Sequence, residues 1–287
     1  MLTNDVPDAL SFSLLGPVRA WRGNAEIALG SRQQRTTLAT LLLREGVAAT
    51  LDELVAGIWG DEAPRSAATT IRTYVSRLRA VLVTDCVESV GGGYALRLAG
   101  DALDVVLFRR HATRAAEAAR RGDSRTVIVE QSAALQLWRG QPLAGALGPY
   151  VQGQRTQLQQ LGIAARIGLL GAQVRLGLYP EVLPELTAMA AAHPLWEDVQ
   201  ALHVTALYGS GRAAEALEQY QRARRALVDE LGMEPGARLS AVHRRILAGD
   251  PSLAAVSATP VRRNVPRPAA VVRGRHHARI FRGQIVA

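Results

Sequence analysis

Residues 64–82, with the sequence PRSAATTIRTYVSRLRAVL, separate into an apolar stripe and a basic face when they are wound into an α-helix. The stripe consists of Ile71, Val75, Leu78 and Leu82. The opposite face consists of Arg65, Ser66, Thr69, Arg72, Thr73, Ser76, Arg77 and Arg79. Burying each large apolar side chain contributes roughly 1.5–3 kcal/mol, so we expect this helix to dock on a core. Pro64 is favoured near a helix start, and Ser66 is expected to cap the helix.

The basic face of this helix favours a polyanionic ligand. Exposed helix faces usually mix Glu with Arg, because i,i+4 pairs stabilise them, yet no acid occurs between residues 63 and 84. Arginine interleaved with Ser and Thr suits contacts to phosphates and base edges. The simpler alternative is a cationic face that meets only solvent, and the neighbouring elements decide between the two.

Short elements precede the basic helix. Residues 11–29 contain apolar stretches cut by Gly-Pro and Gly-Asn, which indicates antiparallel strands. Residues 32–45 predict an amphipathic helix that ends at a glycine, and the following VAAT predicts a short strand. Residues 51–59 predict a second helix, with Thr50 as N-cap and Glu53 completing a capping box.

A hairpin follows the basic helix. Residues 86–98, CVESVGGGYALRL, predict two strands that turn on Gly91–Gly93. This order of elements is that of a winged helix-turn-helix, in which the third helix enters the major groove. Because glycine lets a hairpin tip approach phosphates closely, we expect backbone contacts to DNA from this wing. The residues concerned are Gly91, Gly92, Gly93 and Tyr94. Taken alone, the glycines predict only a turn.

From residue 104 onward the pattern is helical, interrupted by glycine and proline clusters. The expected breaks are Gly122, Gly140–Gly148, Leu178–Pro180, His193–Pro194, Gly209–Gly211 and Gly232–Gly236. GLYPEVLPEL from Gly177 and GRAAEALEQY from Gly211 are alike at an offset of 34 residues, a period typical of tetratricopeptide hairpins, which bind partners or self-associate. GSGRAAEAL could also hold an anion at a helix N-terminus, although a turn between helices is the simpler interpretation.

The sequence therefore predicts a mainly α chain. We expect an α+β winged helix-turn-helix over residues 10–100 and an all-α, tetratricopeptide-like domain over residues 104–250. Residues 252–287 contain seven arginines and no acid, and we expect a basic, disordered tail. Most of the net charge of +9 comes from this tail, because residues 1–100 hold ten arginines and ten acids and are neutral overall. Bulk charge therefore does not establish nucleic-acid binding.

Catalytic and metal-binding patterns are missing from the sequence. No HExxH, GxSxG or Walker A pattern occurs. Cys86 is the single cysteine, which excludes an internal disulfide and a multi-cysteine metal site. No apolar run has membrane-spanning length, and the first residues lack the features of a signal peptide. We expect a soluble, cytoplasmic protein that is not an enzyme and holds no metal or cofactor.

The chain strongly resembles the Streptomyces antibiotic regulatory proteins, which are transcription activators with an OmpR-like winged helix and a helical bacterial transcriptional activation domain. The similar stretches in the first domain include RQQRTTLATLLL, LDELVAGIWGDEAPRSAATTIRTYVSRLRAVL and GGGYALRL. Those in the second are HPLWEDVQALHVTALYGSGRAAEALEQYQRARRAL and DELGMEPGARLSAVHRRIL. Together the resemblance spans residues 10–250.

This resemblance implies a sequence-specific activator of a secondary-metabolite biosynthetic cluster. Such a protein would bind direct repeats in double-stranded DNA upstream of a promoter, as a homodimer or as side-by-side protomers, and would recruit RNA polymerase holoenzyme. The basic helix would be the recognition helix, with contacts from Arg65, Thr69, Arg72, Thr73, Ser76, Arg77 and Arg79. In OmpR-like activators the preceding loop faces RNA polymerase, so Asp61 and Glu62 would contact the basic sigma factor. The alternative is a helical-repeat scaffold whose winged helix binds protein rather than DNA.

Overall fold

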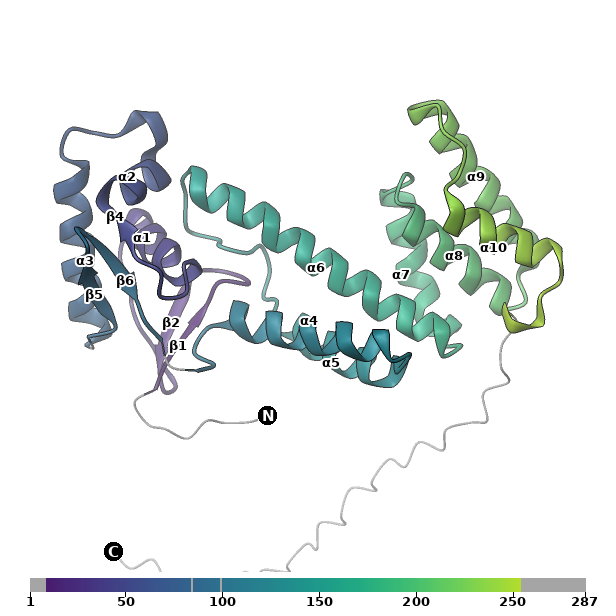
Figure 1. The fold of residues 1–287 in the computed structure, drawn as a ribbon, viewed down its shortest axis with the longest axis horizontal. Helices are drawn as coiled ribbons and strands as arrows, with labels where there is room; N and C mark the ends of the chain where they lie inside the picture. The colour runs from purple at the N-terminus through teal and green to yellow at the C-terminus, as the bar shows by residue number, and fades with distance from the viewer. Residues whose placement is uncertain (1–8, 84, 99, 254–287) are drawn as a thin grey trace, which may run out of the picture. The chain divides into compact units, whose positions relative to one another are not determined.

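The computed structural model describes residues 9–83, 85–98 and 100–253 (Figure 1). The elements of the N-terminal part are β1 (Leu10–Ser13), β2 (Arg19–Arg22), β3 (Ala25–Glu26), α1 (Arg32–Leu43), β4 (Ala49–Thr50), α2 (Leu51–Trp59), the short 3-10 helix η1 (Gly60–Glu62), α3 (Ala67–Leu82), β5 (Val87–Val90) and β6 (Gly93–Leu96). They are followed by α4 (Asp104–Arg120), α5 (Ser124–Gln136), α6 (Pro149–Arg175), α7 (Tyr179–Ala192), α8 (Glu197–Gly209), α9 (Ala213–Leu231), α10 (Ala237–Leu247) and the 3-10 helix η2 (Pro251–Leu253). The predicted mainly α fold, with its small N-terminal strands, is confirmed.

Two small antiparallel sheets frame the first helices. One has the order β1-β2-β3 and the other the order β4-β6-β5. In the second sheet Val90 pairs with Gly93, which leaves Gly91 and Gly92 as the turn. The predicted turn over Gly91–Gly93 is therefore one residue too long. Gly93 belongs to the buried strand, where an added Cβ would lie 2.0 Å from the Ala49 carbonyl oxygen.

The apolar stripe of α3 is buried as its spacing predicts. Ile71, Leu78 and Leu82 are 0% exposed and Val75 is 1% exposed, all within one core with α1 and α2. The capping box of α2 is also formed, because Thr50 Oγ1 accepts from the Glu53 amide at 3.1 Å and the Glu53 carboxylate accepts from the Thr50 amide at 2.9 Å. Because the apolar face of α3 packs against the core, its polar face points outward.

The start of α3 differs from the prediction. The helix begins at Ala67, and the side chain of Ser66 makes no capping hydrogen bond. Ser66 has φ −88° and ψ 5° rather than the extended backbone of a usual N-cap. Its carbonyl instead accepts from both the Thr70 amide and the Thr70 hydroxyl. The Pro64 carbonyl accepts from the Ala67 amide and closes the preceding turn.

A buried carboxylate joins the winged helix to the helical region. Asp104, the first residue of α4, accepts from Ser13 Oγ at 2.8 Å, from the Leu14 amide at 2.9 Å and from the Leu15 amide at 3.0 Å. The segment between α5 and α6 also bonds to the residues just after β1, since the Leu143 amide donates to the Leu14 carbonyl. These bonds are long-range: Ser13 and Asp104, for example, are 91 positions apart in the chain.

The hydrophobic core of the winged helix continues into the helical region. Phe108 of α4 and Val151 and Leu158 of α6 belong to the same core as Leu38 of α1. A second core begins further along α6, at Leu170, and covers α7 to α10. The core is thus continuous across residues 100–104, where the domain boundary was placed, and the division into domains 10–100 and 104–250 stays a prediction.

Helical hairpins build the described residues from α4 onward, with breaks at the predicted glycines and prolines. Gly177 and Gly211, the pair found at an offset of 34 residues, have φ of +74° and +79° and immediately precede the turns into α7 and α9. Leu186 and Tyr220 share that offset, and both are buried. Among the described residues, no helix is both long and apolar enough to cross a membrane. The predicted tail lies outside the described residues, apart from its first two.

Candidate DNA-binding surface

The outward face of α3 carries exposed cations without acidic partners. Arg65, Arg72 and Arg77 are exposed, as are Thr69, Thr73 and Ser76. The ion pairs of the described residues include none of these three arginines. The Thr73 hydroxyl donates to the Thr69 carbonyl at 3.1 Å, so it can offer only its lone pairs to a ligand. The exposed guanidinium groups of Arg72 and Arg77 on α3, and of Arg65 just before it, therefore have no ion-pair partner among the described residues.

Arg79 differs from the other three arginines. It is only partly exposed, and its guanidinium donates from Nε to the Val87 carbonyl at 2.9 Å and from Nη2 to Ser89 Oγ at 3.0 Å. The same group lies 5.7 Å from the centre of the Tyr94 ring, within the range of a cation–π contact. Arg79 thus links α3 to both strands of the hairpin and has fewer donors left for a base.

The tip of the hairpin is open. Gly91 and Gly92 have φ of +55° and +79°, and a Cβ added to either would meet no atom of the described residues within 4 Å. Their backbone amides can therefore approach a phosphate. Gly93 is buried between β4 and β5, which takes it out of the predicted backbone contacts. Tyr94 is half-buried beneath Arg79 and supports the wing.

The end of α3 is held by a contact that the sequence did not reveal. Arg22 of β2 donates from Nη2 to the carbonyl of Leu82, the last residue of α3. A cation at a helix C-terminus is favoured by the helix dipole. The two residues are separated by 60 positions, so no local spacing in the sequence could have indicated this pair.

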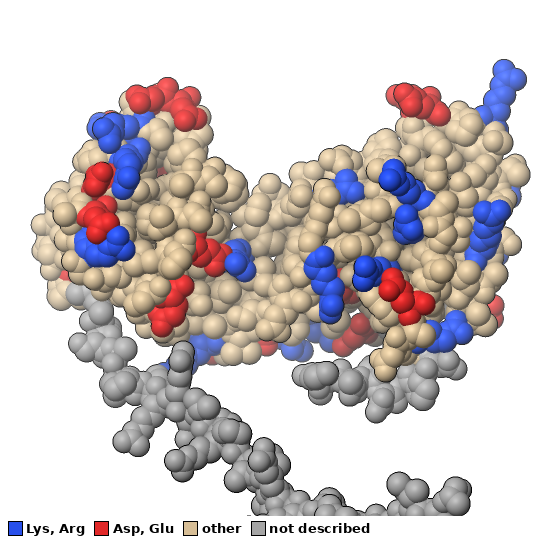
Figure 2. Space-filling view, turned by 180° about the vertical axis from the view of Figure 1, so that it is seen from behind, with Lys and Arg blue, Asp and Glu red and all other residues tan. Residues whose placement is uncertain are grey.

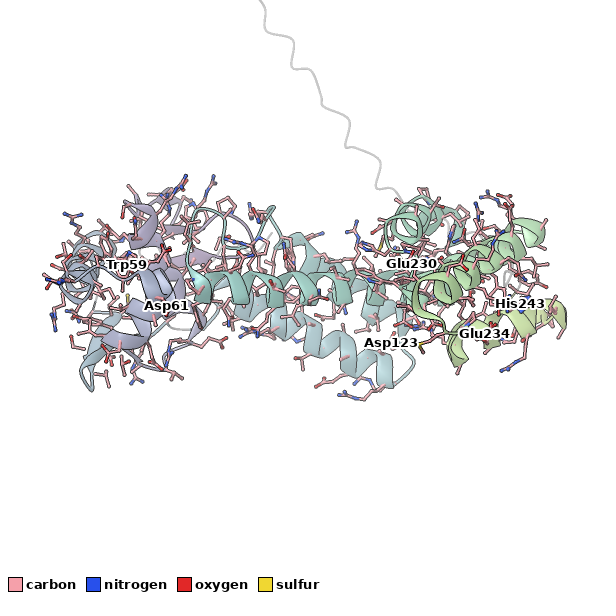
Figure 3. All side chains as sticks on the ribbon, turned by 90° about the horizontal axis from the view of Figure 1, so that it is seen from above. Trp59, Asp61, Asp123, Glu230, Glu234 and His243 are labelled. Atoms are coloured by element: carbon pink, nitrogen blue, oxygen red, sulfur yellow. The ribbon has the colours of Figure 1, made fainter. Side chains whose placement is uncertain are left out.

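The turn before α3 carries the predicted acidic pair. Asp61 and Glu62 lie in η1, are exposed, and belong to no ion pair among the described residues. Figure 3 shows Trp59, the last residue of α2, and Asp61 of η1 near the first turn of α6. Consistent with this view, a Cβ added to Gly60 would lie 3.2 Å from Pro149 Cγ. The acids therefore sit on a turn that is backed by α6 and open to solvent.

Charge is distributed unevenly over small areas rather than over whole faces. In Figure 2, basic side chains prevail on the right-hand part of the drawn face, basic and acidic side chains lie close together on the left-hand part, and uncharged surface lies between these groups. The candidate surface is therefore defined by the local arrangement of α3, η1 and the hairpin. No group of His, Cys, Asp and Glu among the described residues could hold a metal ion.

Two family models match the chain over most of its length. A model described as "Transcriptional regulatory protein, C terminal" matches residues 24–96. A model described as "Bacterial transcriptional activator domain" matches residues 103–247. The first range contains α1 to the hairpin and the second contains α4 to α10, so the candidate surface lies within the first match.

Individual relatives are similar over the same region. The regulatory protein AfsR of Streptomyces griseus is 46% identical over 250 residues, which are 86% of this chain and 25% of that protein. The regulatory protein DnrI of Streptomyces peucetius is 32% identical over 260 residues, covering 85% of this chain and 94% of that protein. The chain thus spans about a quarter of the length of this AfsR, and the same share, 25%, of a second AfsR from another Streptomyces.

A solved structure shares the arrangement of the fold. It is that of Mycobacterium tuberculosis EmbR in complex with a low-affinity phosphopeptide, with a TM-score of 0.79 and 30% sequence identity. The match covers 84% of this chain and 65% of that chain.

Proposed function

This chain belongs to the Streptomyces antibiotic regulatory protein family, and we propose that it is a sequence-specific DNA-binding activator of transcription. Its targets would be promoters of a secondary-metabolite biosynthetic cluster. The protein would act in the cytoplasm, bound to the nucleoid. The observation that carries this proposal is the outward face of α3 and the turn before it, where Arg72, Arg77 and Arg65 have no acidic partner among the described residues.

Different residues of the surface would perform different tasks on DNA. Arg72 and Arg77 lie in the middle of α3 and would donate to base edges, because a guanidinium matches the two acceptors of guanine. Arg65 precedes the helix and would contact a phosphate. The amides of Gly91 and Gly92 would reach the flanking backbone. The hydroxyls of the remaining polar positions, Thr69, Thr73 and Ser76, would complete the contact.

A salt series on the purified full chain tests DNA binding. Fluorescence anisotropy with a duplex from the cognate promoter should give a saturable complex whose affinity falls as salt rises, with a log–log slope of about −0.9 per phosphate contacted. A scrambled duplex of the same length is the control and should bind more weakly. An absence of saturable binding to any duplex would instead favour the protein-binding scaffold.

Recruitment of RNA polymerase would use the acidic turn. Asp61 and Glu62 lie just before the helix that would face DNA. Acidic side chains there would weaken DNA binding through charge repulsion. We therefore assign them to a different partner. Complementary charge mainly raises the association rate and orients an encounter, which suits contact with the basic sigma factor. Adjacent protomers on direct repeats would present several such turns.

Reversing the two charges separates this role from DNA binding. The double variant Asp61→Arg, Glu62→Arg should keep or tighten operator binding and reduce transcription in a purified system. The pair Asp229→Arg, Glu230→Arg near the end of α9 is a matched control, since it also reverses two neighbouring exposed acids. Full activation by the first double variant would leave η1 as a connector only.

A further inference from the structure

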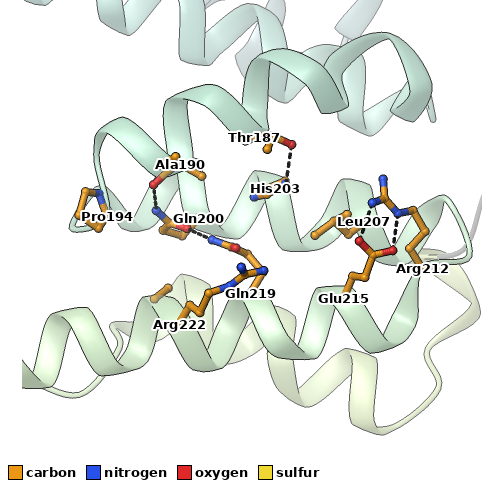
Figure 4. A pocket seen from close by; sticks show the side chains of 12 residues that line it. Thr187, Ala190, Pro194, Gln200, His203, Leu207, Arg212, Glu215, Gln219 and Arg222 are labelled. Carbon is orange, nitrogen blue, oxygen red and sulfur yellow. Dashed lines mark hydrogen bonds and ion pairs between the residues drawn. The ribbon is translucent and has the colours of Figure 1, made fainter.

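A cavity of about 350 Å³ lies between α7, α8 and α9 (Figure 4). Helix α8 forms its floor, and both α7 and α9 pack on α8. Its volume falls at the lower end of the range found for small-molecule sites, roughly 300–1,000 Å³. The apolar part of the lining consists of four small or rigid side chains and one leucine, namely Ala190, Ala191, Pro194, Ala223 and Leu207. The cavity therefore has room for a single ring and its substituent.

A chain of hydrogen bonds fixes the amide groups of this cavity. Gln200, which is 1% exposed, donates from Nε2 to the Ala190 carbonyl at 2.9 Å and to the His193 carbonyl at 3.2 Å. Both its hydrogens are used, so its Oε1 must accept, and it accepts from Gln219 Nε2 at 2.7 Å. Gln219 is left with one N–H and its carbonyl oxygen for a ligand, in an orientation set by the buried Gln200.

A buried neutral imidazole lines the same cavity. The Thr187 hydroxyl donates its hydrogen to the Leu183 carbonyl at 2.8 Å, so it must accept from His203 Nε2 at 3.1 Å. His203 is 5% exposed, and its Nδ1 has no hydrogen-bond partner among the described residues. Burial, followed by the charges of Arg222 and Arg212, lowers the pKa of His203 from 6.5 to about 4. The imidazole is therefore uncharged at neutral pH.

The charges around the cavity do not balance. Arg212 is paired with Glu215 by two bonds, of 2.7 Å from Nε and 2.5 Å from Nη2. Arg222 lines the cavity as well, and no carboxylate among the described residues lies within ion-pair distance of it. Figure 4 shows the Arg222 and Gln219 side chains converging beside the cavity. One positive charge is thus left for an anion.

We propose that this cavity binds a small carboxylic acid that carries one ring, with Arg222 and Gln219 donating to the carboxylate. An arginine beside an amide N–H supplies parallel donors of the kind that a planar carboxylate accepts. The ring would lie against the apolar side chains, above the imidazole of His203. The site is separate from α3, and the proposal does not rest on DNA binding.

Benzoate is a suitable probe, and benzamide is its neutral isostere. Titration of the full chain with benzoate should shift the side-chain amide signals of Gln219 and the ring nitrogen signals of His203 in a saturable way, with a dissociation constant of about 1 mM for a ligand of this size. Benzamide should shift the same signals with a dissociation constant at least tenfold higher than that of benzoate. Equal binding of the two ligands would contradict an acid site.

Two variants and one control locate the binding. Arg222→Gln should weaken benzoate binding by about tenfold or more, because a hydrogen bond to a charged group is lost, and should leave benzamide unchanged. Gln219→Leu should weaken benzoate by about three- to tenfold. Arg225→Gln changes an exposed arginine of the same helix that does not line the cavity and should have no effect. The proposal is overturned if Arg222→Gln binds benzoate like the parent, or if Arg225→Gln weakens it equally.

Discussion

Arg72 and Arg79 look equivalent in the sequence, since both fall on the polar face of one helix, but their surroundings differ. Arg72 is exposed without an ion pair among the described residues, whereas Arg79 is bonded to Val87 and Ser89 of the hairpin. A free guanidinium can distinguish one base from another, while a guanidinium held by the protein positions the wing. The two arginines should therefore respond differently to substitution.

Arg72→Ala should weaken binding to the cognate duplex by about 1–3 kcal/mol and weaken binding to a scrambled duplex much less. Arg79→Ala should weaken both duplexes alike and also lower the free energy of unfolding, because the wing loses its link to α3. Anisotropy with both duplexes and urea unfolding measure these effects. Equal losses of specificity in the two variants would show that Arg79 also reads bases.

Asp104 is a buried residue whose hydrogen bonds should contribute strongly to stability. Burial raises the pKa of its carboxyl, and the hydrogen bonds from Leu15, Leu14 and Ser13 offset part of that rise. Asp104→Ala leaves these donors buried without a partner, so the free energy of unfolding should fall by about 3 kcal/mol or more. Urea unfolding checks this value. Asp101→Ala, which removes a partly exposed partner of Arg110, should cost less than about 1 kcal/mol.

At the scale of elements, the residue that follows α3 has an unfavourable backbone conformation. Val83 follows its last residue with φ 43° and ψ 47°, the left-handed region, and its side chain is 69% exposed. A residue with a Cβ pays roughly 1–2 kcal/mol there, and a β-branched residue is unusual. Glycine avoids this cost but loses more entropy on folding.

Val83→Gly should therefore raise the free energy of unfolding by about 0.5–1 kcal/mol. Thermal or urea unfolding of the full chain measures it. Val47→Gly is the matched control, because Val47 is also exposed, at 64%, and is absent from the residues with positive φ. That control should be destabilised, and a loss of stability in both variants would argue against backbone strain at the end of α3.

Local patterns in the sequence predicted most elements, and long-range contacts account for what they missed. The capping box of Thr50 and Glu53, the buried stripe of α3 and the glycine breaks each depend on neighbours within about one or two helical turns. Gly93 was assigned to the hairpin tip because nothing local shows that β4 approaches it. The roles of Asp104 and Arg79 likewise depend on partners outside their own elements.

The sequence predicts which residues make up the candidate surface, but it only partly predicts which of them are available to contact DNA. The exposed positions of α3 follow from its periodicity, and the structure places Arg72 and Arg77 on that face and Arg65 in the turn before it. Whether a given guanidinium is already bonded depends on where the hairpin lies, which periodicity does not contain. The cavity between α7, α8 and α9 depends on packing between three helices and left no motif in the sequence.

For the whole molecule, the continuous core makes the winged helix depend on the helices that follow it. Leu14 and Leu15 are 0% exposed and share their core with Phe108 and Leu143. A fragment that ends at residue 100 would expose these apolar side chains and lose the bonds of Asp104. Stability and DNA affinity should therefore fall together when the chain is shortened.

The fragment 1–100 should unfold at a lower urea concentration than the full chain and bind the operator more weakly and with less cooperativity. Part of the weakening comes from the lost core, and part from lost contacts between neighbouring protomers, which raise effective concentration. Circular dichroism and anisotropy at a temperature where the fragment is folded separate the two. Equal affinity and cooperativity for fragment and full chain would show that the helices take no part in binding.

The central claim is that α3 reads a repeated DNA sequence, and a DNase footprint on the promoters beside the gene tests it most directly. The full chain should protect repeated segments in one orientation, spaced by about one helical turn, 10–10.5 bp, or a multiple of it. Arg72→Ala at the same concentration should lose that protection while it remains folded. No protected segment on any of these promoters, or the same protection with Arg72→Ala and Arg77→Ala combined, would contradict the claim.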